Sequence, residues 1–443
     1  MGRDPVWSLL FRFSGPAIVS MTVASTYNLA DAIFVGRLGA DALAAMTVTF
    51  PLLLSFIAVA SGTAVGATSL ISRCLGAGEK KDADRTACVS ITLCFFLSAV
   101  IVTACLPNID PILTLLGAEN TVLYLAKEYA AILIKFIVFL FLSMVLGNII
   151  RAEGNPLFSS SVMVSSSILN IILDPVLIFG LGPVPEMGIS GAAVATVISQ
   201  ALSSSVYLIY LLFGRCGYEF RVTHFLPYPK VVLEIYRIGV ASIVRSGVQF
   251  IAMGVINRAA ASHGVITLAL IGVLIRLGRF VQMPAIGIGQ GLLPLIGYNF
   301  GAGKMKRVTE LVIKAAVSGI IWSTFCWITI MLFPEFVLNL FNSDAAFLAE
   351  GIHAVRLYFI CIFILGIQMI PSFFFQGIGR GMPATTLSAA RHFFFLLPSI
   401  LILPRIYGVN GLWVSFPVAD VLTFVLGLSW ILIEFRRNRI LFK

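Results

Sequence analysis

The chain has 443 residues, of which 59% are hydrophobic and only 11% are charged, and its mean hydropathy is +1.01. Soluble proteins carry roughly 25% charged residues, so this composition excludes a soluble globular protein and indicates an all-α integral membrane protein. The formal net charge of +10 comes mainly from short loops between apolar stretches, which is typical of membrane topology rather than of nucleic-acid binding. We therefore expect a lipid bilayer around the chain, no nucleic-acid partner and a protein that works as a monomer.

Twelve apolar stretches are long enough to span a membrane, which takes about 20 residues each. Basic residues concentrate in alternate loops and in the tail, which predicts a multi-pass protein of the plasma membrane with both termini in the cytoplasm. The expected spans are 8–35, 46–72, 87–107, 121–149, 157–181, 187–213, 231–259, 265–299, 309–333, 350–376, 382–404 and 407–434.

The second half of the chain repeats the first. A shift of 225 carries residues 75–80 (LGAGEK) onto 300–305 (FGAGKM), and it also aligns three further glycine pairs. Residues 188–191 (GISG) match 408–411 (GVNG) at a shift of 220. Because six spans precede the second half, the repeats share one orientation, a layout that transporters use. We expect two six-helix lobes related by a pseudo-two-fold axis along the membrane normal: residues 1–213, a cytoplasmic linker 214–230, and residues 231–443.

The fifth span carries an amide and a carboxylate in an apolar run, within residues 167–175 (SILNIILDP). Asn170 and Asp174 are four residues apart and share one helix face. Pro175 follows, and because it lacks an N–H it predicts a bend and a freed carbonyl at Ile171. These oxygens suit Na⁺ or a proton relay; alternatively, Asp174 only ties two helices together.

The first span repeats this pattern with Asp31 three residues after Asn28. At 1.5 Å per residue, Asp31 lies roughly 7 Å, Asp174 roughly 12 Å and Thr196 roughly 13 Å from the outer ends of their helices. Three helices thus place oxygen atoms in the same half of the first lobe. Asp31, Asn170 and Asp174 are the candidate ligands if the ion is Na⁺, and the alternative is a proton carried by the acids.

The repeat favours a dedicated site over a structural role for these acids. A shift of 225 carries Asp31 onto Ile256. A shift of 227, which aligns residues 154–156 (GNP) with 381–383 (GMP), carries Asp174 onto Leu401, although a carboxylate needed for folding should recur. Two carboxylates close together in a low-dielectric interior cannot both ionise cheaply, so the pair should hold a proton or share a cation.

The second half carries an unusual set of basic residues inside its spans. We expect a substrate cavity that accepts an anionic or zwitterionic molecule, because arginine binds carboxylates through two hydrogen bonds. Alternatively, Asp420 pairs with Arg245 or Arg391 and the remaining cations line water. The expected cavity residues are Arg245, Gln249, Arg276, Arg279, Gln290, Arg391 and Asp420.

Four motifs together resemble the multidrug and toxic compound extrusion (MATE) transporters: residues 35–40 (VGRLGA), 151–156 (RAEGNP), 188–196 (GISGAAVAT) and 291–303 (GLLPLIGYNFGAG). The resemblance implies two lobes forming a V, alternating access, and export of small molecules against inward H⁺ or Na⁺. One prokaryotic branch of this family is similar in having an acid pair in the first lobe. The resemblance assigns coupling-ion roles to Asp31, Asn170, Asp174 and Thr196.

We therefore predict a secondary active efflux transporter that exchanges H⁺ or Na⁺ for small organic molecules. No catalytic residues and no cofactor besides the coupling ion are expected, since the acids lack the Gly-x-Gly-Asp setting of membrane aspartyl proteases. The alternative within transporters is a flippase or exporter of a lipid-linked or anionic substrate, which the basic second lobe favours.

Overall fold

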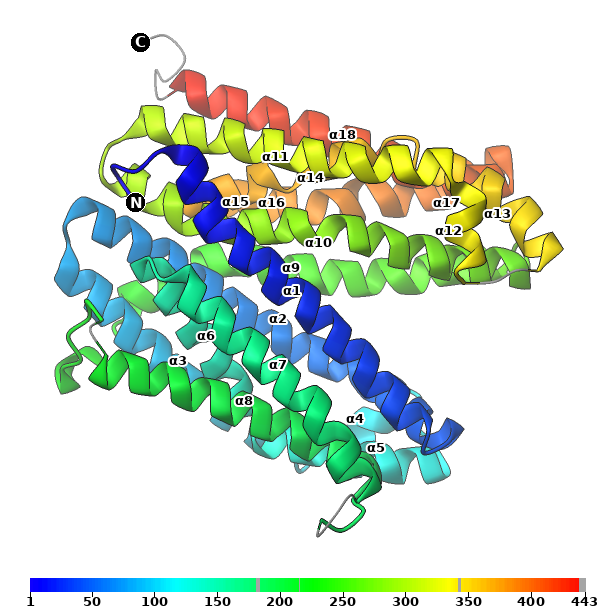
Figure 1. Cartoon of the computed structure of the whole chain (residues 1–443), viewed down its shortest axis with the longest axis horizontal. Coiled ribbons are helices and arrows are strands. Elements are labelled where there is room, and N and C mark those ends of the chain that lie inside the picture. The colour runs from blue at the N-terminus through cyan, green and yellow to red at the C-terminus, as the bar shows by residue number, and fades with distance from the viewer. Residues whose placement is uncertain (181–183, 215, 342–343, 438–443) are drawn as a thin grey trace. The chain divides into compact units, whose positions relative to one another are not determined.

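The computed structural model describes residues 1–180, 184–214, 216–341 and 344–437. Nearly all of these residues lie in helices, and no strand occurs among them (Figure 1). This follows from the apolar sequence, because a backbone in lipid must satisfy its own hydrogen bonds and a helix does so within one segment. In chain order the α-helices are α1 (Val6–Gly36), α2 (Ala40–Ala77), α3 (Lys80–Cys105), α4 (Ile109–Leu115), α5 (Asn120–Lys135), α6 (Ile137–Glu153), α7 (Pro156–Phe179), α8 (Gly188–Phe213), α9 (Pro229–Ala261), α10 (Val265–Gly301), α11 (Met305–Leu332), α12 (Pro334–Asn339), α13 (Ala345–Tyr358), α14 (Leu365–Gln368), α15 (Ile370–Gly377), α16 (Gly381–Ala389), α17 (Leu397–Tyr407) and α18 (Val409–Arg437). Two short 3₁₀ segments, η1 (Val222–His224) and η2 (Ile362–Ile364), and a π-helix, η3 (Ala390–Leu396), complete the described elements.

Ten described helical segments are long and apolar enough to cross a membrane, and two bent pairs raise the number to as many as twelve. The first pair, α5 and α6, bends by 50°, and the second, residues 347–358 and 362–377, bends by 47°. These pairs occupy the fourth and tenth predicted spans. The shift of 225 carries the first break, at Phe136, onto the second, at Cys361. The predicted all-α membrane fold is confirmed.

One compact unit, here called the N-unit, consists of residues 19–239. In it α6 packs against α2 and α8 around a core of small and aliphatic side chains, and α7 lies alongside α8 (Figure 1). Gly191 permits the close approach of α7 to α8, because a Cβ there would stand 2.5 Å from the carbonyl oxygen of Leu177. The packing of α7 on α8 brings the polar residues in the middle of both helices together.

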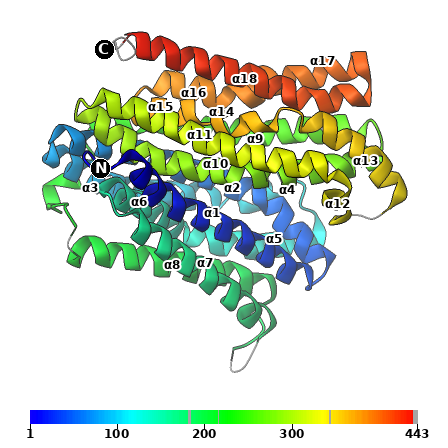
Figure 2. The same ribbon diagram turned by 45° about the horizontal axis from the view of Figure 1, so that its top comes forward.

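The other compact unit, here called the C-unit, consists of residues 1–18 and 240–443. Its core has two parts: one lies among α9, α10, α13 and α18, and the other gathers the start of α1 with α10, α11 and α15. Helices α10 and α11 lie side by side in this unit (Figure 2). The described residues thus give each half of the chain a helical core of its own.

The division into units differs from the predicted lobes at two places. The start of α1 packs on the second half of the sequence, and the start of α9 packs on the first half. At the start of α1, the Ser14 hydroxyl donates to the carbonyl of Ile288 at 3.4 Å, and a Cβ on Gly291 would stand 2.6 Å from Ser14 Oγ. At the start of α9, a Cβ on Gly66 would stand 2.1 Å from the carbonyl oxygen of Ile235. Gly66 and Gly291 are repeat equivalents, so the same close helix contact occurs once in each unit.

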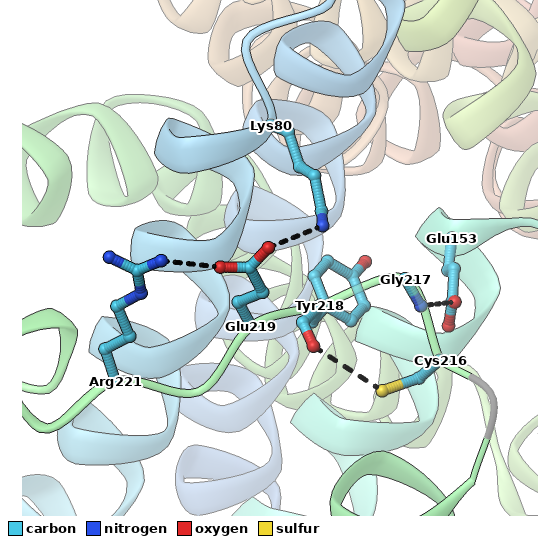
Figure 3. A network of polar contacts seen from close by, with 7 residues as sticks. All are labelled: Lys80, Glu153, Cys216, Gly217, Tyr218, Glu219 and Arg221. Atoms are coloured by element: carbon cyan, nitrogen blue, oxygen red, sulfur yellow. Dashed lines mark hydrogen bonds and ion pairs between the residues drawn. The ribbon is translucent and has the colours of Figure 1, made fainter.

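The linker between α8 and α9 folds onto the N-unit (Figure 3). The Tyr218 hydroxyl donates to the carbonyl of Ile149 at 3.1 Å, and the Gly217 amide donates to Glu153. Glu219 pairs with Lys80 at 3.1 Å and with Arg221 at 3.0 Å. These two cations lower the pKa of the exposed Glu219 carboxyl, whereas burial raises the pKa of Tyr218. The linker is therefore a fixed part of the N-unit surface.

Candidate functional site

The two predicted acids of the N-unit are both buried. Asp31 on α1 is 4% exposed and Asp174 on α7 is fully buried. The two carboxyl groups lie within electrostatic reach of one another, although neither has a cationic partner within 4 Å in the described chain. Helix α7 continues through Pro175 without interruption, so this face of α7 remains aligned with α8. The structure therefore gathers the acids into one apolar surrounding.

Asn170 joins the acid on α7 to α8. Its side-chain amide points to Asp174 Oδ1 at 3.5 Å and to Thr196 Oγ1 at 3.4 Å. Asn170 is 2% exposed, and Thr196 is half-buried. This contact places three of the predicted residues together across two helices. Asn28, also predicted for this site, lies outside the residues whose side chains the structure describes.

Three oxygen atoms of this cluster are buried and have no hydrogen-bond partner among the side chains and backbone that the structure describes: Asp31 Oδ1, Asn170 Oδ1 and Asp174 Oδ2. Buried polar atoms in proteins are nearly always hydrogen-bonded, so three such oxygens in one region point to a ligand that supplies positive charge. Carboxylate and amide oxygens are ligands for hard cations, and a carboxylate can also take a proton. In the described residues no group of three or more His, Cys, Asp and Glu suits a metal ion. The donor set therefore fits H⁺ or Na⁺ better than a transition metal.

Tyr129 on α5 belongs to the same cluster and was not predicted. It is 3% exposed and lies within electrostatic reach of Asp31, Asp174 and Tyr27. A tyrosine in an apolar helix has no distinctive sequence pattern, since most such residues pack or face lipid. Its depth could have indicated it, because Tyr129 lies nine residues into α5, roughly 13 Å from the helix start and level with Asp174.

The C-unit contains a small cavity among α9, α10, α13, η3 and α18. Its volume is about 50 Å³, enough for a few water molecules and far less than a drug-sized molecule needs. Four predicted residues line it: Gln249, Arg279, Arg391 and Asp420. The lining also includes His392, Gln282, the aromatic residues Tyr358, Phe359 and Phe416, and several aliphatic side chains. The C-unit cavity therefore combines fixed cations with an aromatic wall.

An ion pair lies in the wall of this cavity. Arg391 Nε donates to Asp420 Oδ1 at 2.6 Å, which shows that Asp420 pairs with Arg391 and not with Arg245. Arg391 is the second residue of the π-helix η3, and Asp420 is 4% exposed on α18. π-Helical turns are rare and occur often at functional sites. The pair therefore joins an irregular helix to a regular one at the cavity.

The other predicted cavity residues lie outside the lining. Arg245 stands over the ring of Phe373 at 5.9 Å. Arg276 and Arg279 are both exposed on α10, and of these two only Arg279 lines the cavity. Gln290 is half-buried farther along α10 and is not part of the lining. Arg276 and Arg279 were both predicted to line the cavity, but residues three apart differ by about 60° around a helix, so one can line it without the other.

Comparisons with known proteins agree with this architecture. The MatE family model matches residues 16–176 and 238–399, two stretches of nearly equal length that begin 222 residues apart. The multidrug export proteins MepA of Staphylococcus aureus and Staphylococcus haemolyticus are each 27% identical to this chain, over 95% and 99% of its length and 92% and 95% of theirs.

Solved structures give the same result. An outward-facing multidrug resistance MATE family transporter of the MOP superfamily has a TM-score of 0.93 at 28% identity, covering 99% of this chain and 97% of its own. A MOP superfamily transporter from Pyrococcus furiosus, described by the reverse polarity of its binding pocket, has a TM-score of 0.90 at 28% identity, covering 98% and 96%. The paired family match explains the internal repeat, and the chain belongs to the MatE family of multidrug and toxic compound extrusion (MATE) transporters.

Proposed function

We propose that this protein exports small organic molecules across the plasma membrane by alternating access, driven by the inward movement of H⁺ or Na⁺. The observation that carries this proposal is the buried cluster of Asp31, Asn170 and Asp174, in which three oxygens lack a hydrogen-bond partner within the described part of the chain. The MatE family and the relatives named as multidrug exporters support the transport direction and a broad range of substrates. We also infer a monomer with both termini in the cytoplasm, as the basic loops indicate.

The coupling ion would bind where the two acids approach one another. Without an ion, two buried carboxylates repel one another and lack solvation, so this state is costly in an apolar surrounding. A proton on one acid, or a Na⁺ shared by both, removes this repulsion. Asn170 holds the α7 acid beside Thr196 on α8, so binding of the ion draws on groups from three helices. The ion can thereby favour one packing of the N-unit over another, which is what coupling requires.

Gradient-driven transport in proteoliposomes tests the proposal. Two probes with the same ring and opposite charge serve as substrates: 1-naphthoate and 1-naphthylmethylammonium. We expect an imposed pH or Na⁺ gradient to drive at least one probe against its concentration gradient. Asp174→Asn should abolish this movement, whereas Asp41→Asn, which removes an exposed acid of the same unit, should not. Movement of neither probe, or unchanged transport by the Asp174 variant, would contradict the proposal.

The same assay separates the two coupling ions. If H⁺ is coupled, a pH gradient drives transport in buffers free of Na⁺, and dissipating the pH gradient stops it. If Na⁺ is coupled, the Na⁺ gradient drives transport at equal pH on both sides. Because both ions would use the same carboxylates, Asp174→Asn should remove either dependence.

A second candidate is a flippase or exporter of a lipid-linked or anionic substrate. The cations Arg279 and Arg391 in the C-unit cavity favour it, because they are suited to phosphate or carboxylate groups. For the similar Pyrococcus furiosus transporter, a binding pocket of reverse polarity is described as suggesting a different function. A headgroup-accessibility assay with a lipid-linked sugar in the same vesicles would distinguish it from export of water-soluble probes.

A further inference from the structure

The C-unit cavity has more positive than negative charge. Arg279 and Arg391 line it together with one acid, Asp420, and a third cation, Arg245, lies within electrostatic reach of His392 in the lining. Arg279 has no acidic partner within 4 Å among the described residues. Arg279 is exposed and stands where the cavity opens, so its guanidinium is accessible to a negatively charged ligand that enters the cavity.

The contact between Arg391 and Asp420 uses one edge of the guanidinium. Only Nε has a hydrogen-bond partner in the described chain, which leaves the two Nη groups of Arg391 available at the cavity wall. A guanidinium can bind a carboxylate or sulfonate through two parallel hydrogen bonds, which a single 2.6 Å contact does not provide. Asp420 therefore occupies part of a site that a free organic anion could occupy more completely.

The remaining wall suits a planar apolar body. The rings of Tyr358 and Phe416 lie 4.3 Å apart between centroids, and those of Tyr358 and Phe359 lie 4.7 Å apart. Ile256, Ile275 and Leu396 extend this surface. An aromatic ring gains from packing against such a wall, while an anionic group on the same molecule reaches the arginines.

The cavity is too small for such a molecule in this structure, so a part of its wall must move. The segment best suited to move is η3, because a π-helix carries an extra residue per turn and can convert to an α-helix by a shift of one hydrogen-bond register. Arg391 lies on η3, whereas Asp420 lies on the regular helix α18. A register shift in η3 would rotate Arg391 relative to Asp420, which stays in place on α18.

We propose that the C-unit cavity binds an organic anion with an aromatic body and one carboxylate or sulfonate, and that Asp420 occupies the anion's position on Arg391 until the ligand displaces it. This inference rests on the proposed export function, for which it names the substrate class. Arg279 supplies the second positive charge, and Asp420 acts as an internal competitor that keeps the empty site closed.

Equilibrium dialysis of the full chain in zwitterionic lipid nanodiscs tests the inference, with 1-naphthoate and 1-naphthylmethylammonium as matched probes. We expect the anion to bind more tightly than the cation. Asp420→Asn should tighten anion binding roughly tenfold or more, because it removes a charge-assisted hydrogen bond that competes with the ligand. Arg279→Gln should weaken anion binding about tenfold, whereas Arg405→Gln, an exposed arginine on the neighbouring α17, should not change it.

Arg391→Lys and Arg391→Gln separate the role of charge from a loss of folding. Both variants remove the guanidinium Nε–H that donates to Asp420. The lysine variant keeps the positive charge, so it should retain part of the anion binding that the glutamine variant loses. Tighter binding of the cation by the wild type, together with its loss in Asp420→Asn, would overturn the inference and make Asp420 a cation receptor. Unchanged naphthoate binding in Arg279→Gln and Arg391→Gln would also overturn it.

Failure of this inference can be told apart from failure of the export function. If an ion gradient drives the cation probe in a manner that depends on Asp174, and naphthoate does not bind, the anion site is refuted and the export function stands. If naphthoate binds as expected and no gradient moves either probe, the anion site stands and coupled export is refuted.

Discussion

Replacing Asp174 by asparagine should stabilise the resting protein while it abolishes coupled transport. Asp174 is fully buried, and its only described hydrogen bond is the 3.5 Å contact from Asn170. Its second oxygen has no partner among the described residues. An aspartate in the middle of a membrane helix costs about 2.5–3.5 kcal/mol, and a neutral amide of the same shape avoids much of this cost. We therefore expect a gain of about 1–2 kcal/mol in the free energy of unfolding without Na⁺ at alkaline pH, where the wild type lacks its ion.

Denaturant unfolding in nanodiscs measures this difference, with Asp41→Asn as the control for loss of an exposed acid. Adding Na⁺ or lowering the pH should stabilise the wild type and reduce the gap, because a ligand that binds only the folded state stabilises it. Asp174→Asn should respond less. If the variant is less stable than the wild type in every buffer, Asp174 is a structural tie between helices and the coupling hypothesis is refuted.

Three further changes follow from the packing and the electrostatics. Tyr129→Phe should weaken binding of the coupling ion about three- to tenfold in a radioligand or pH-electrode assay, because it removes a hydroxyl beside the two acids; unchanged binding would exclude a role for the hydroxyl. Gly191→Leu should lower the free energy of unfolding by about 1–3 kcal/mol and impair ion binding, since any Cβ there overlaps the backbone of α7; a wild-type melting curve would contradict the close contact. Lys80 and Arg221 lower the pKa of Glu219, so the stability that Glu219 adds to the linker is complete above its ordinary pKa of 4.5 and is lost as the pH falls through the lower pKa of the folded state. Hydrogen exchange in the linker should rise only under such acidic conditions, and Glu219→Gln should remove this pH dependence.

Sequence patterns predicted the helices and the repeat because both depend on periodic, local features. Apolar stretches of the right length located the spans, including the two bent pairs that the structure divides at Phe136 and Cys361. Glycine motifs located the repeat, since glycine at a close helix contact cannot be replaced without moving the backbone. Gly66 and Gly291 show this, because each meets the backbone of a packed helix.

The division into units could not be predicted, because it depends on where the ends of α1 and α9 pack rather than on where the loops lie. The linker at residues 214–230 looks like a boundary in sequence. In the structure it is bound to the N-unit through Tyr218 and Glu219, and the chain passes between units inside two continuous helices. A helix that belongs to two units has no break in hydropathy to mark the change.

The candidate sites were predicted in part, for reasons that differ between the two units. Asp31 and Asp174 are conspicuous because carboxylates are costly in apolar helices, so their positions alone suggested a site. Asp420 pairs with Arg391 rather than with Arg245, and Arg391 lies in the π-helix η3. No hydropathy pattern reveals a π-helix. Tyr129 was missed because tyrosine is common in membrane helices whether or not it has a function.

Counting the ions that are released when substrate binds is the most direct test of whether Asp31 and Asp174 hold the coupling ion. Purified protein in nanodiscs is loaded with ²²Na⁺ or equilibrated in weakly buffered solution, and 1-naphthoate or 1-naphthylmethylammonium is then added. If the two acids hold the coupling ion, the wild type should release H⁺ or Na⁺ on addition of at least one probe, and the Asp31→Asn, Asp174→Asn double variant should release none. Equal release from both proteins would show that the ion binds elsewhere and that the two acids are not the coupling site.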